Sequence, residues 1–217
     1  MSETPFPFRH VAVEGPIGVG KTSLVERLAA RFSGVKVLED VTNPFLEPFY
    51  RGVPGAAFQA QVFFLLSRYQ QQVELQQPEL FTQLVVADYT MAKDRIFARL
   101  NLSDAEFALY DRLYSLLVPG LPKPDLVVYL EASVEVCLER IRKRGRPFER
   151  TIDAAYLRRL KEAYAEFFFH YNETPLLVVN TDDLDFVHRE QDFDALVAKM
   201  VRVRRGTHVF IPLGSGT

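Results

Sequence analysis

The sequence predicts an α/β protein in which a parallel sheet of five strands lies between two layers of helices. Three observations predict this fold class. Five short runs rich in valine and leucine have the length of buried parallel strands. Amphipathic stretches separate these runs, as helices do in βαβ units. A glycine-rich segment joins the first run directly to the first amphipathic stretch, as a tight strand-to-helix turn requires.

The expected strands follow one another along most of the chain. They cover residues 10–14, 35–39, 84–88, 125–131 and 176–180. Each is almost continuously apolar, which is typical of strands that are covered on both faces. The tail "GTHVFIPLGSGT" carries no such run. We expect it either to lack fixed structure or to add a strand at the edge of the sheet.

Helices are predicted in the gaps between these strands. After the first strand, Leu24, Leu28 and Phe32 recur every fourth residue. A long helix is predicted over 56–77, where Pro78 ends it. Cap residues mark three further helices: Ser103, which forms a capping box with Glu106 for a helix through Leu117, then Ser133 and Asp153. A last helix is predicted over 192–202.

The chain of 217 residues suits a single domain over 1–217, since no repeat and no linker divides it. An isoelectric point near 6.1 argues against a dedicated nucleic-acid binder. The sequence begins without a signal peptide, holds one cysteine, Cys137, and has no apolar run of the ~18 residues that a membrane helix needs. These observations predict a cytoplasmic protein that has no membrane partner.

The segment "GPIGVGKT" follows the first strand and precedes a helix. Glycines let the backbone turn its N–H groups toward phosphate oxygens, and the helix start adds unpaired donors. In this pattern the lysine contacts the β and γ phosphates, and the threonine hydroxyl faces Mg²⁺. The expected phosphate-binding residues are Gly15, Pro16, Ile17, Gly18, Val19, Gly20, Lys21, Thr22 and Ser23. The sequence therefore predicts a nucleoside-triphosphate site.

Two carboxylates are expected at the same edge of the sheet. Asp88 ends the third strand and is interpreted as a ligand of Mg²⁺, directly or through water, together with Thr22. Glu39 ends the second strand and is either a general base for an attacking hydroxyl or an ordinary strand-end acid. On the long helix, Gln61 and Arg68 are seven residues apart and share a face. A glutamine there is either a surface residue or a group that pairs with a base edge.

The stretch "RIRKRGRPFER", residues 140–150, holds six cations although the whole chain has a formal charge of −2. Gly145 and Pro147 interrupt the preceding helix. Beside a phosphate site, such a stretch favours an arginine-rich lid that closes over the nucleotide. A solvated basic surface is the alternative. Nucleic-acid binding is a poor third interpretation, because the segment is short and lacks the aromatic interleaving that single-strand binders use.

Several of these motifs together resemble the deoxynucleoside kinases. The resemblance rests on "GPIGVGKTSL", "LED", "FY" eleven residues before a helical glutamine, "LLSR" and "ERIRKRGRPFE", in the same order and spacing over residues 10–180. The stretch "NPFLEPFY" looks most like the bacterial deoxyadenosine/deoxyguanosine kinase branch. The resemblance implies a P-loop kinase fold, ATP with Mg²⁺ as the donor, and a deoxynucleoside, with a purine favoured, as the acceptor.

The resemblance also implies roles for single residues. Glu39 matches the general base for the 5′-hydroxyl, and Tyr50 with Glu149 matches the pair that holds the sugar 3′-hydroxyl. Gln61, Arg68 and Asp94 match the polar groups around the base. Arg140, Arg144 and Arg146 match the lid arginines. Members commonly dimerise, which implies a homodimer or a dimer with a related kinase subunit through the stretches 58–73 and 107–117, although core packing explains these stretches equally well.

One position departs from the family pattern. The family usually has an arginine directly after the acid of its third strand, and Tyr89 stands there in this chain. The nearby cations that can substitute for it are Lys93 and Arg95. This departure supports one alternative, a nucleotide-binding regulatory protein without turnover. A nucleoside-monophosphate kinase is a second alternative, because its fold and lid are alike.

Overall fold

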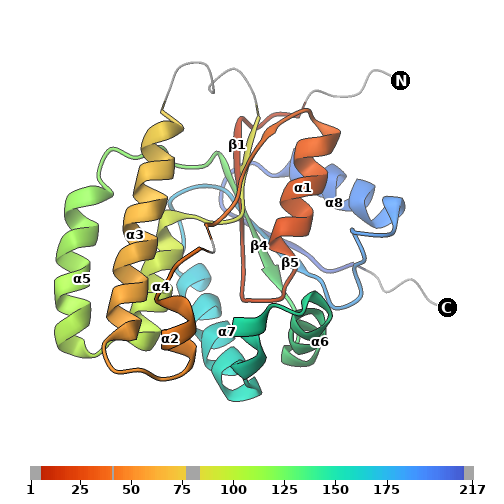
Figure 1. Cartoon of the computed structure of the whole chain (residues 1–217). Helices are drawn as coiled ribbons and strands as arrows, with labels where there is room; N and C mark the ends of the chain where they lie inside the picture. The colour runs from red at the N-terminus through yellow and green to blue at the C-terminus, as the bar shows by residue number, and fades with distance from the viewer. Residues whose placement is uncertain (1–5, 41, 77–83, 213–217) are drawn as a thin grey trace.

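The computed structural model describes residues 6–40, 42–76 and 84–212. One sheet forms the centre of the molecule (Figure 1), and its strands are all parallel. Its strands lie in the order β2-β3-β1-β4-β5-β6. They are β1 His10–Glu14, β2 Val35–Val37, β3 Val85–Ala87, β4 Leu126–Glu131, β5 Leu176–Asn180 and β6 Thr207–Phe210. The predicted α/β class and the parallel sheet are confirmed.

The predicted number of five strands was wrong, because the tail adds β6 at the edge of the sheet. β6 pairs in parallel with β5, with Val178 opposite Val209. Its residues alternate between exposed and partly buried. An edge strand that is partly buried on only one of its faces has no continuous apolar run. The sequence of the tail therefore did not decide between an edge strand and a lack of fixed structure.

Helices cover both sides of the sheet. They are α1 Lys21–Arg31, α2 Leu46–Tyr50, α3 Ala56–Glu74, α4 Met91–Asn101, α5 Asp104–Leu117, α6 Val134–Arg144, the short 3-10 helix η2 Pro147–Thr151, α7 Ala154–Phe169 and α8 Glu190–Arg202. Figure 1 shows α3, α4 and α5 as one group and α1 with α8 as another, with the strands between them. An ion pair from Arg27 to Glu190 joins α1 to α8.

The caps expected from the sequence are present. Ser103 and Glu106 form a reciprocal capping box at the start of α5. The side chains of Ser133 and Asp153 each accept a hydrogen bond from a backbone N–H in the first turn of α6 and α7. The described part of the long helix ends at Glu74, and its predicted end at Gln77 and Pro78 lies outside the described residues.

Among the described residues, two α-helices were not predicted. α2 is a single short turn. α4 buries Lys93 and Asp94 beside its apolar Ile96 and Ala98. Buried charges interrupt the apolar stripe by which a helix is recognised in a sequence. Both helices matter for function because they contribute side chains to the pocket described below.

The strand order brings the carboxyl ends of β1, β2 and β3 together at one edge of the sheet. The hydrophobic core beneath this edge fixes the strands through Val11, Val13, Val86, Val127 and Val128, which are fully buried. Within the described ranges, no helix is both long enough and apolar enough to cross a membrane.

Candidate active site

The glycine-rich loop links β1 to α1, and glycine is required there for steric reasons. Gly15 has a φ of 144°, and a Cβ atom at this position would lie 2.4 Å from the carbonyl oxygen of Leu130. A Cβ at Gly18 would lie 2.5 Å from the carbonyl oxygen of Cys137. The loop is therefore packed against its surroundings, so its backbone N–H groups are held ready for an anion.

Lys21 is the first residue of α1 and lies inside this loop. Its Nζ donates to the carbonyl oxygens of Gly15 at 2.8 Å and Pro16 at 3.1 Å. Burial, together with the nearby Lys93 ammonium, lowers the pKa of Lys21 to about 8. No side chain caps the N-terminus of α1, so its first N–H groups and the lysine together form an anion site.

Asp88 follows β3 and connects the phosphate loop with the segment after β2. Its Oδ2 accepts a hydrogen bond from the Thr22 hydroxyl at 2.9 Å, and its Oδ1 accepts one from the Glu39 backbone N–H at 2.7 Å. A hydroxyl and a carboxylate are hard oxygen ligands of the kind that Mg²⁺ takes beside phosphates, so this pair fits the ion.

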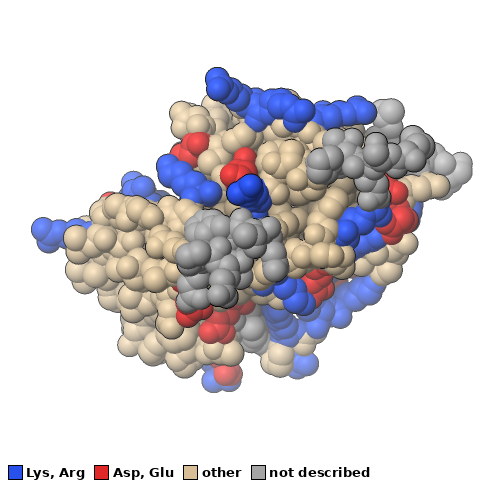
Figure 2. All heavy atoms as spheres, turned by 90° about the horizontal axis from the view of Figure 1, so that it is seen from above, with Lys and Arg blue, Asp and Glu red and all other residues tan. Residues whose placement is uncertain are grey.

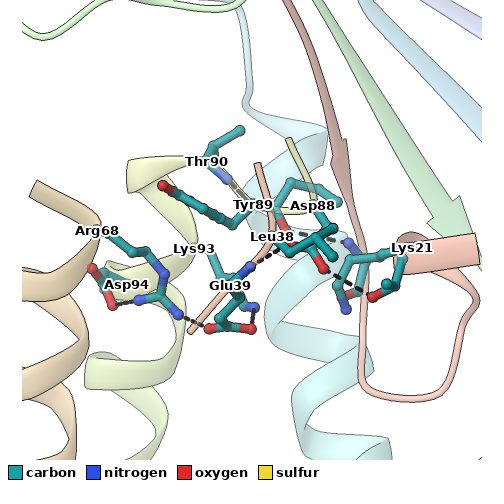
Figure 3. Close-up of polar contacts among 12 residues, drawn as sticks. Lys21, Leu38, Glu39, Arg68, Asp88, Tyr89, Thr90, Lys93 and Asp94 are labelled. Atoms are coloured by element: carbon teal, nitrogen blue, oxygen red, sulfur yellow. Dashed lines mark hydrogen bonds and ion pairs between the residues drawn. The ribbon is translucent and has the colours of Figure 1, made fainter. Parts of the chain in front are cut away.

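Glu39 lies two residues beyond β2 and is held by two cations from different helices (Figure 3). Its Oε2 accepts a hydrogen bond from Lys93 Nζ at 2.5 Å, and its Oε1 is bonded to an Arg68 guanidinium nitrogen. Burial opposes ionisation of Glu39, but Lys93 and Arg68 outweigh it and hold the pKa of Glu39 well below its ordinary value. The carboxylate therefore stays ionised.

Three buried side chains in one part of the site keep polar atoms without a hydrogen-bond partner among the described residues. These atoms are Gln61 Oε1 and Arg68 Nε on α3, and Asp94 Oδ2 on α4. Arg68 also forms an ion pair with the other oxygen of Asp94. Leaving such groups unsatisfied costs about 1–3 kcal/mol each, so a polar ligand that bonds to Gln61 and Arg68, which line the cavity described below, is favoured.

The predicted lid segment 140–150 consists of the last turns of α6, Gly145 and η2. Arg144 grips Glu149 with two nitrogens, at 2.7 and 3.1 Å, and Arg146 lies 3.5 Å from the same carboxylate. Glu149 is buried. Burial, together with the nearby Tyr156 and Glu149, raises the pKa of Tyr50 on α2. Arg140 instead bonds to the Val19 carbonyl oxygen and to Thr181.

Most of these residues open onto one cavity of about 270 Å³. Among the residues predicted for the site, it is lined by Ile17, Gly18, Lys21, Thr22, Glu39, Tyr50, Gln61, Arg68, Asp88, Arg144, Arg146 and Glu149. The other predicted residues do not line it: Gly15, Pro16, Val19, Gly20, Ser23, Asp94 and Arg140. Asp94 lies behind Arg68, and Ser23 lines a separate groove between α1 and α8.

Sequence reasoning missed several residues of this site. Glu14 at the end of β1 is fully buried, and its Oε1 accepts hydrogen bonds from the Thr90 backbone at 2.6 Å and the Thr90 hydroxyl at 2.9 Å. The acid that ends "HVAVE" was the available signal. Three aromatic rings, Phe49, Phe64 and Phe97, also line the cavity. Rings of this kind supply flat apolar faces for a ring-shaped ligand.

The structure shows which groups surround Tyr89, which stands where the family usually has an arginine. Tyr89 is buried, and its hydroxyl donates to Gln71 at 2.7 Å. Arg95 pairs with Asp111 at 2.9 Å and lies over the Tyr114 ring. Of the two cations proposed to substitute for the family arginine, Lys93 is therefore the one at Glu39.

Comparison with known proteins gives one consistent result. The family model for deoxynucleoside kinases matches residues 11–203. The chain is 38% identical to the deoxyguanosine kinase of Bacillus subtilis over 91% of its own length and 97% of that protein. It is 30% identical to the deoxyadenosine/deoxycytidine kinase of B. subtilis, over 89% and 92% of the two chains. A structure of deoxyadenosine kinase from M. mycoides with bound dATP superposes with a TM-score of 0.77 at 26% identity, covering 88% and 98%.

Proposed function

The chain belongs to the deoxynucleoside kinase family, and we propose that it transfers the γ-phosphoryl group of ATP to the 5′-hydroxyl of a purine deoxynucleoside. One observation carries this proposal: Lys21 of the phosphate loop and Glu39 open onto the same cavity. Deoxyguanosine or deoxyadenosine is the proposed acceptor, because the relative at 38% identity is a deoxyguanosine kinase and a further relative acts on deoxyadenosine. The product is the 5′-monophosphate, as in nucleotide salvage.

The donor triphosphate is proposed to lie on the backbone of the loop 15–22, which includes Pro16, Ile17 and Val19. Ser23 extends this site by one residue. Lys21 leaves the loop carbonyls and contacts the β and γ phosphates. Thr22 and Asp88 would hold Mg²⁺. When bound, this ion neutralises charge on the phosphate oxygens.

Glu39 is proposed to orient the 5′-hydroxyl and to take its proton. The hydroxyl oxygen attacks the γ-phosphorus, the bond from that phosphorus to the β–γ bridging oxygen breaks, and ADP leaves. A carboxylate with a lowered pKa is a weak base, but phosphoryl transfer depends chiefly on positioning and charge stabilisation. An acid that stays ionised is well suited to hold the hydroxyl in line.

The acceptor base is proposed to lie between Gln61 and Arg68, with Asp94 behind them. The unpartnered atoms of Gln61 and Arg68, which line the cavity, support this assignment, since a base edge carries both donors and acceptors. Tyr50 and Glu149 are proposed to hold the sugar 3′-hydroxyl. Arg144 and Arg146, in the proposed lid over 140–150, then stabilise the transferring phosphoryl group. Arg140 supports the phosphate loop through its hydrogen bond to the Val19 carbonyl oxygen.

The direct test is to supply the four deoxynucleosides separately with MgATP, and deoxyguanylate as a fifth acceptor. We expect a purine deoxynucleoside to be phosphorylated and the monophosphate to be inert, which excludes a monophosphate kinase. Glu39→Gln is expected to lower kcat by about 100-fold or more. A variant as fast as the wild type would show that Glu39 is not the general base, and a wild type that binds ATP without turnover would contradict the whole proposal.

We further propose that the single domain 1–217 forms a dimer, either with itself or with a related kinase subunit. Four apolar side chains on α3 and α5 are exposed: Leu66, Val73, Leu109 and Leu116. Figure 2 shows a largely uncharged surface on the side where Figure 1 places these helices. The proposed location is the cytoplasm, where ATP is abundant and the free buried thiol of Cys137 stays reduced.

A further inference from the structure

Lys93 is a buried cation to which the mechanism proposed above assigns no role. It lies in the first turn of α4, is 4% exposed, and lines the cavity. Its Nζ lies 2.5 Å from Glu39 Oε2 and 5.7 Å from the centre of the Phe97 ring. In the described part of the chain, Glu39 is the one carboxylate with which Lys93 forms an ion pair. Figure 3 shows the two groups meeting from α4 and from the segment after β2.

The backbones on both sides of this contact are fixed by other interactions. Glu39 N–H is bonded to Asp88, and Thr90, which precedes α4, is bonded to Glu14 through both its backbone and its hydroxyl. The ion pair is therefore not needed to bring the two segments together. What it determines is the direction of the Glu39 side chain, which otherwise rotates about three bonds.

Three other cations of the site are engaged wholly or partly with groups other than Glu39. Arg68 divides its guanidinium between Glu39 and Asp94, Lys21 bonds to the phosphate loop, and Arg144 grips Glu149. An acceptor base that engages Arg68 competes for the same guanidinium. Lys93 is then the group that keeps the Glu39 carboxylate in place. A carboxylate has about four lone-pair sites, so Glu39 still has about two free, enough for the 5′-hydroxyl, while both cations are bound.

We propose that Lys93 is a positioning residue that holds the Glu39 carboxylate facing the phosphate loop and thereby sets the rate of phosphoryl transfer. This inference rests on the proposed function. It also assigns a cation to α4. The residue after Asp88 is Tyr89, whose hydroxyl is bonded to Gln71, so that position supplies no cation to Glu39. A residue that acts through Glu39 affects the chemical step, so its loss lowers kcat and leaves the KM for nucleoside and ATP nearly unchanged.

The test is a double-mutant cycle of Lys93→Met with Glu39→Gln, in which kcat and both KM values are measured with the best deoxynucleoside. K93M alone is expected to lower kcat by about 100-fold. In the E39Q background the same change is expected to alter kcat by less than about threefold, because the group through which Lys93 acts is already lost. A purely structural role would lower kcat equally in both backgrounds.

Lys93→Arg restores the charge and is expected to recover most of the lost rate. Arg95→Met is the matched control, since Arg95 lies two residues further along α4 and is engaged with Asp111 outside the cavity. If K93M does not fold, Lys93→Leu replaces it in the same cycle, because leucine favours a helix and leaves no donor for Glu39. Full kcat in the uncharged variant, losses that multiply in the double variant, or an arginine variant as slow as K93M would each overturn the inference. A wild type that phosphorylates no deoxynucleoside would instead overturn the proposed function.

Discussion

Arg68 contacts both the proposed general base and the proposed base-reading part of the site. One nitrogen of its guanidinium is bonded to Glu39 and another to Asp94 (Figure 3). These carboxylates raise the pKa of Arg68 despite its burial, so it remains charged. Because the proposed base-reading group and the proposed general base share this guanidinium, a poorly fitting base disturbs the position of Glu39. Discrimination between bases should therefore appear in kcat as well as in KM.

Asp88 offers a prediction about the metal. Asp88→Asn keeps an oxygen that can accept from Thr22 or from the Glu39 N–H, but it removes the negative charge. We expect the Mg²⁺ concentration that gives half-maximal activity to rise by about ten- to a hundredfold, because the cation loses a charged partner. The measurement is a Mg²⁺ titration at saturating ATP and nucleoside.

Asp125→Asn is the matched control for this titration. Asp125 also accepts backbone hydrogen bonds beside a strand, from the N–H groups of Arg9 at 2.8 Å and His10 at 2.9 Å, but it is not among the residues that line the cavity. This variant should lose some stability and keep the wild-type dependence on Mg²⁺. An unchanged Mg²⁺ titration in D88N would show that Asp88 does not serve the metal.

At the scale of one element, the capping box of α5 gives a prediction about stability. The Ser103 hydroxyl accepts from the Glu106 N–H at 3.4 Å, and Glu106 Oε2 accepts from the Ser103 N–H at 2.9 Å. Ser103→Ala removes the hydroxyl and should lower the free energy of unfolding by about 1 kcal/mol, measured by urea denaturation at pH 7. Ser115→Ala in the last turn of α5 is the control, and it should be neutral because alanine favours helices.

The same box should depend on pH. Hydrogen bonds from Ser103 lower the pKa of Glu106 below its ordinary value of 4.5. A lowered folded-state pKa means that the contribution of Glu106 is present above pH 4.5 and is lost as the pH falls through the lower folded value. The effect of S103A on stability should therefore be smaller at pH 3 than at pH 7. An equal loss at both values would contradict this account of the box.

Elements whose signals are local could be predicted from the sequence. The phosphate loop, the buried strands and the three caps each depend on residues only a few positions apart. α4 was not predicted, and β6 was only one of two alternatives for the tail, because their patterns reflect contacts with distant parts of the chain. α4 buries Lys93 against a carboxylate 54 residues away, and β6 exists because β5 offers an edge. The local sequence of a single helix or strand contains little information about such distant contacts.

At the scale of the whole molecule, the cavity is assembled from segments that are far apart in the sequence. The loop before α1, the segment after β2, helices α2, α3 and α4, and η2 all contribute side chains. The order of parallel strands explains why Glu39 and Asp88 meet Lys21, since these strands end at one edge. Spacing alone could not place Tyr50, Gln61 or Glu149 in the same cavity, and the family resemblance supplied that grouping.

The proposed dimer is tested by changing the apolar face that α3 and α5 expose. Leu116 is 80% exposed on α5, so Leu116→Glu should leave the fold of one chain intact. In a twofold interface each residue occurs twice, so two buried carboxylates would oppose association. We expect the wild type to sediment as a dimer of 24.9 kDa chains and L116E as a monomer. Phe169→Glu, at an equally exposed apolar position on α7, should stay dimeric. A monomeric wild type, or an L116E variant that still dimerises, would show that this face is not the interface.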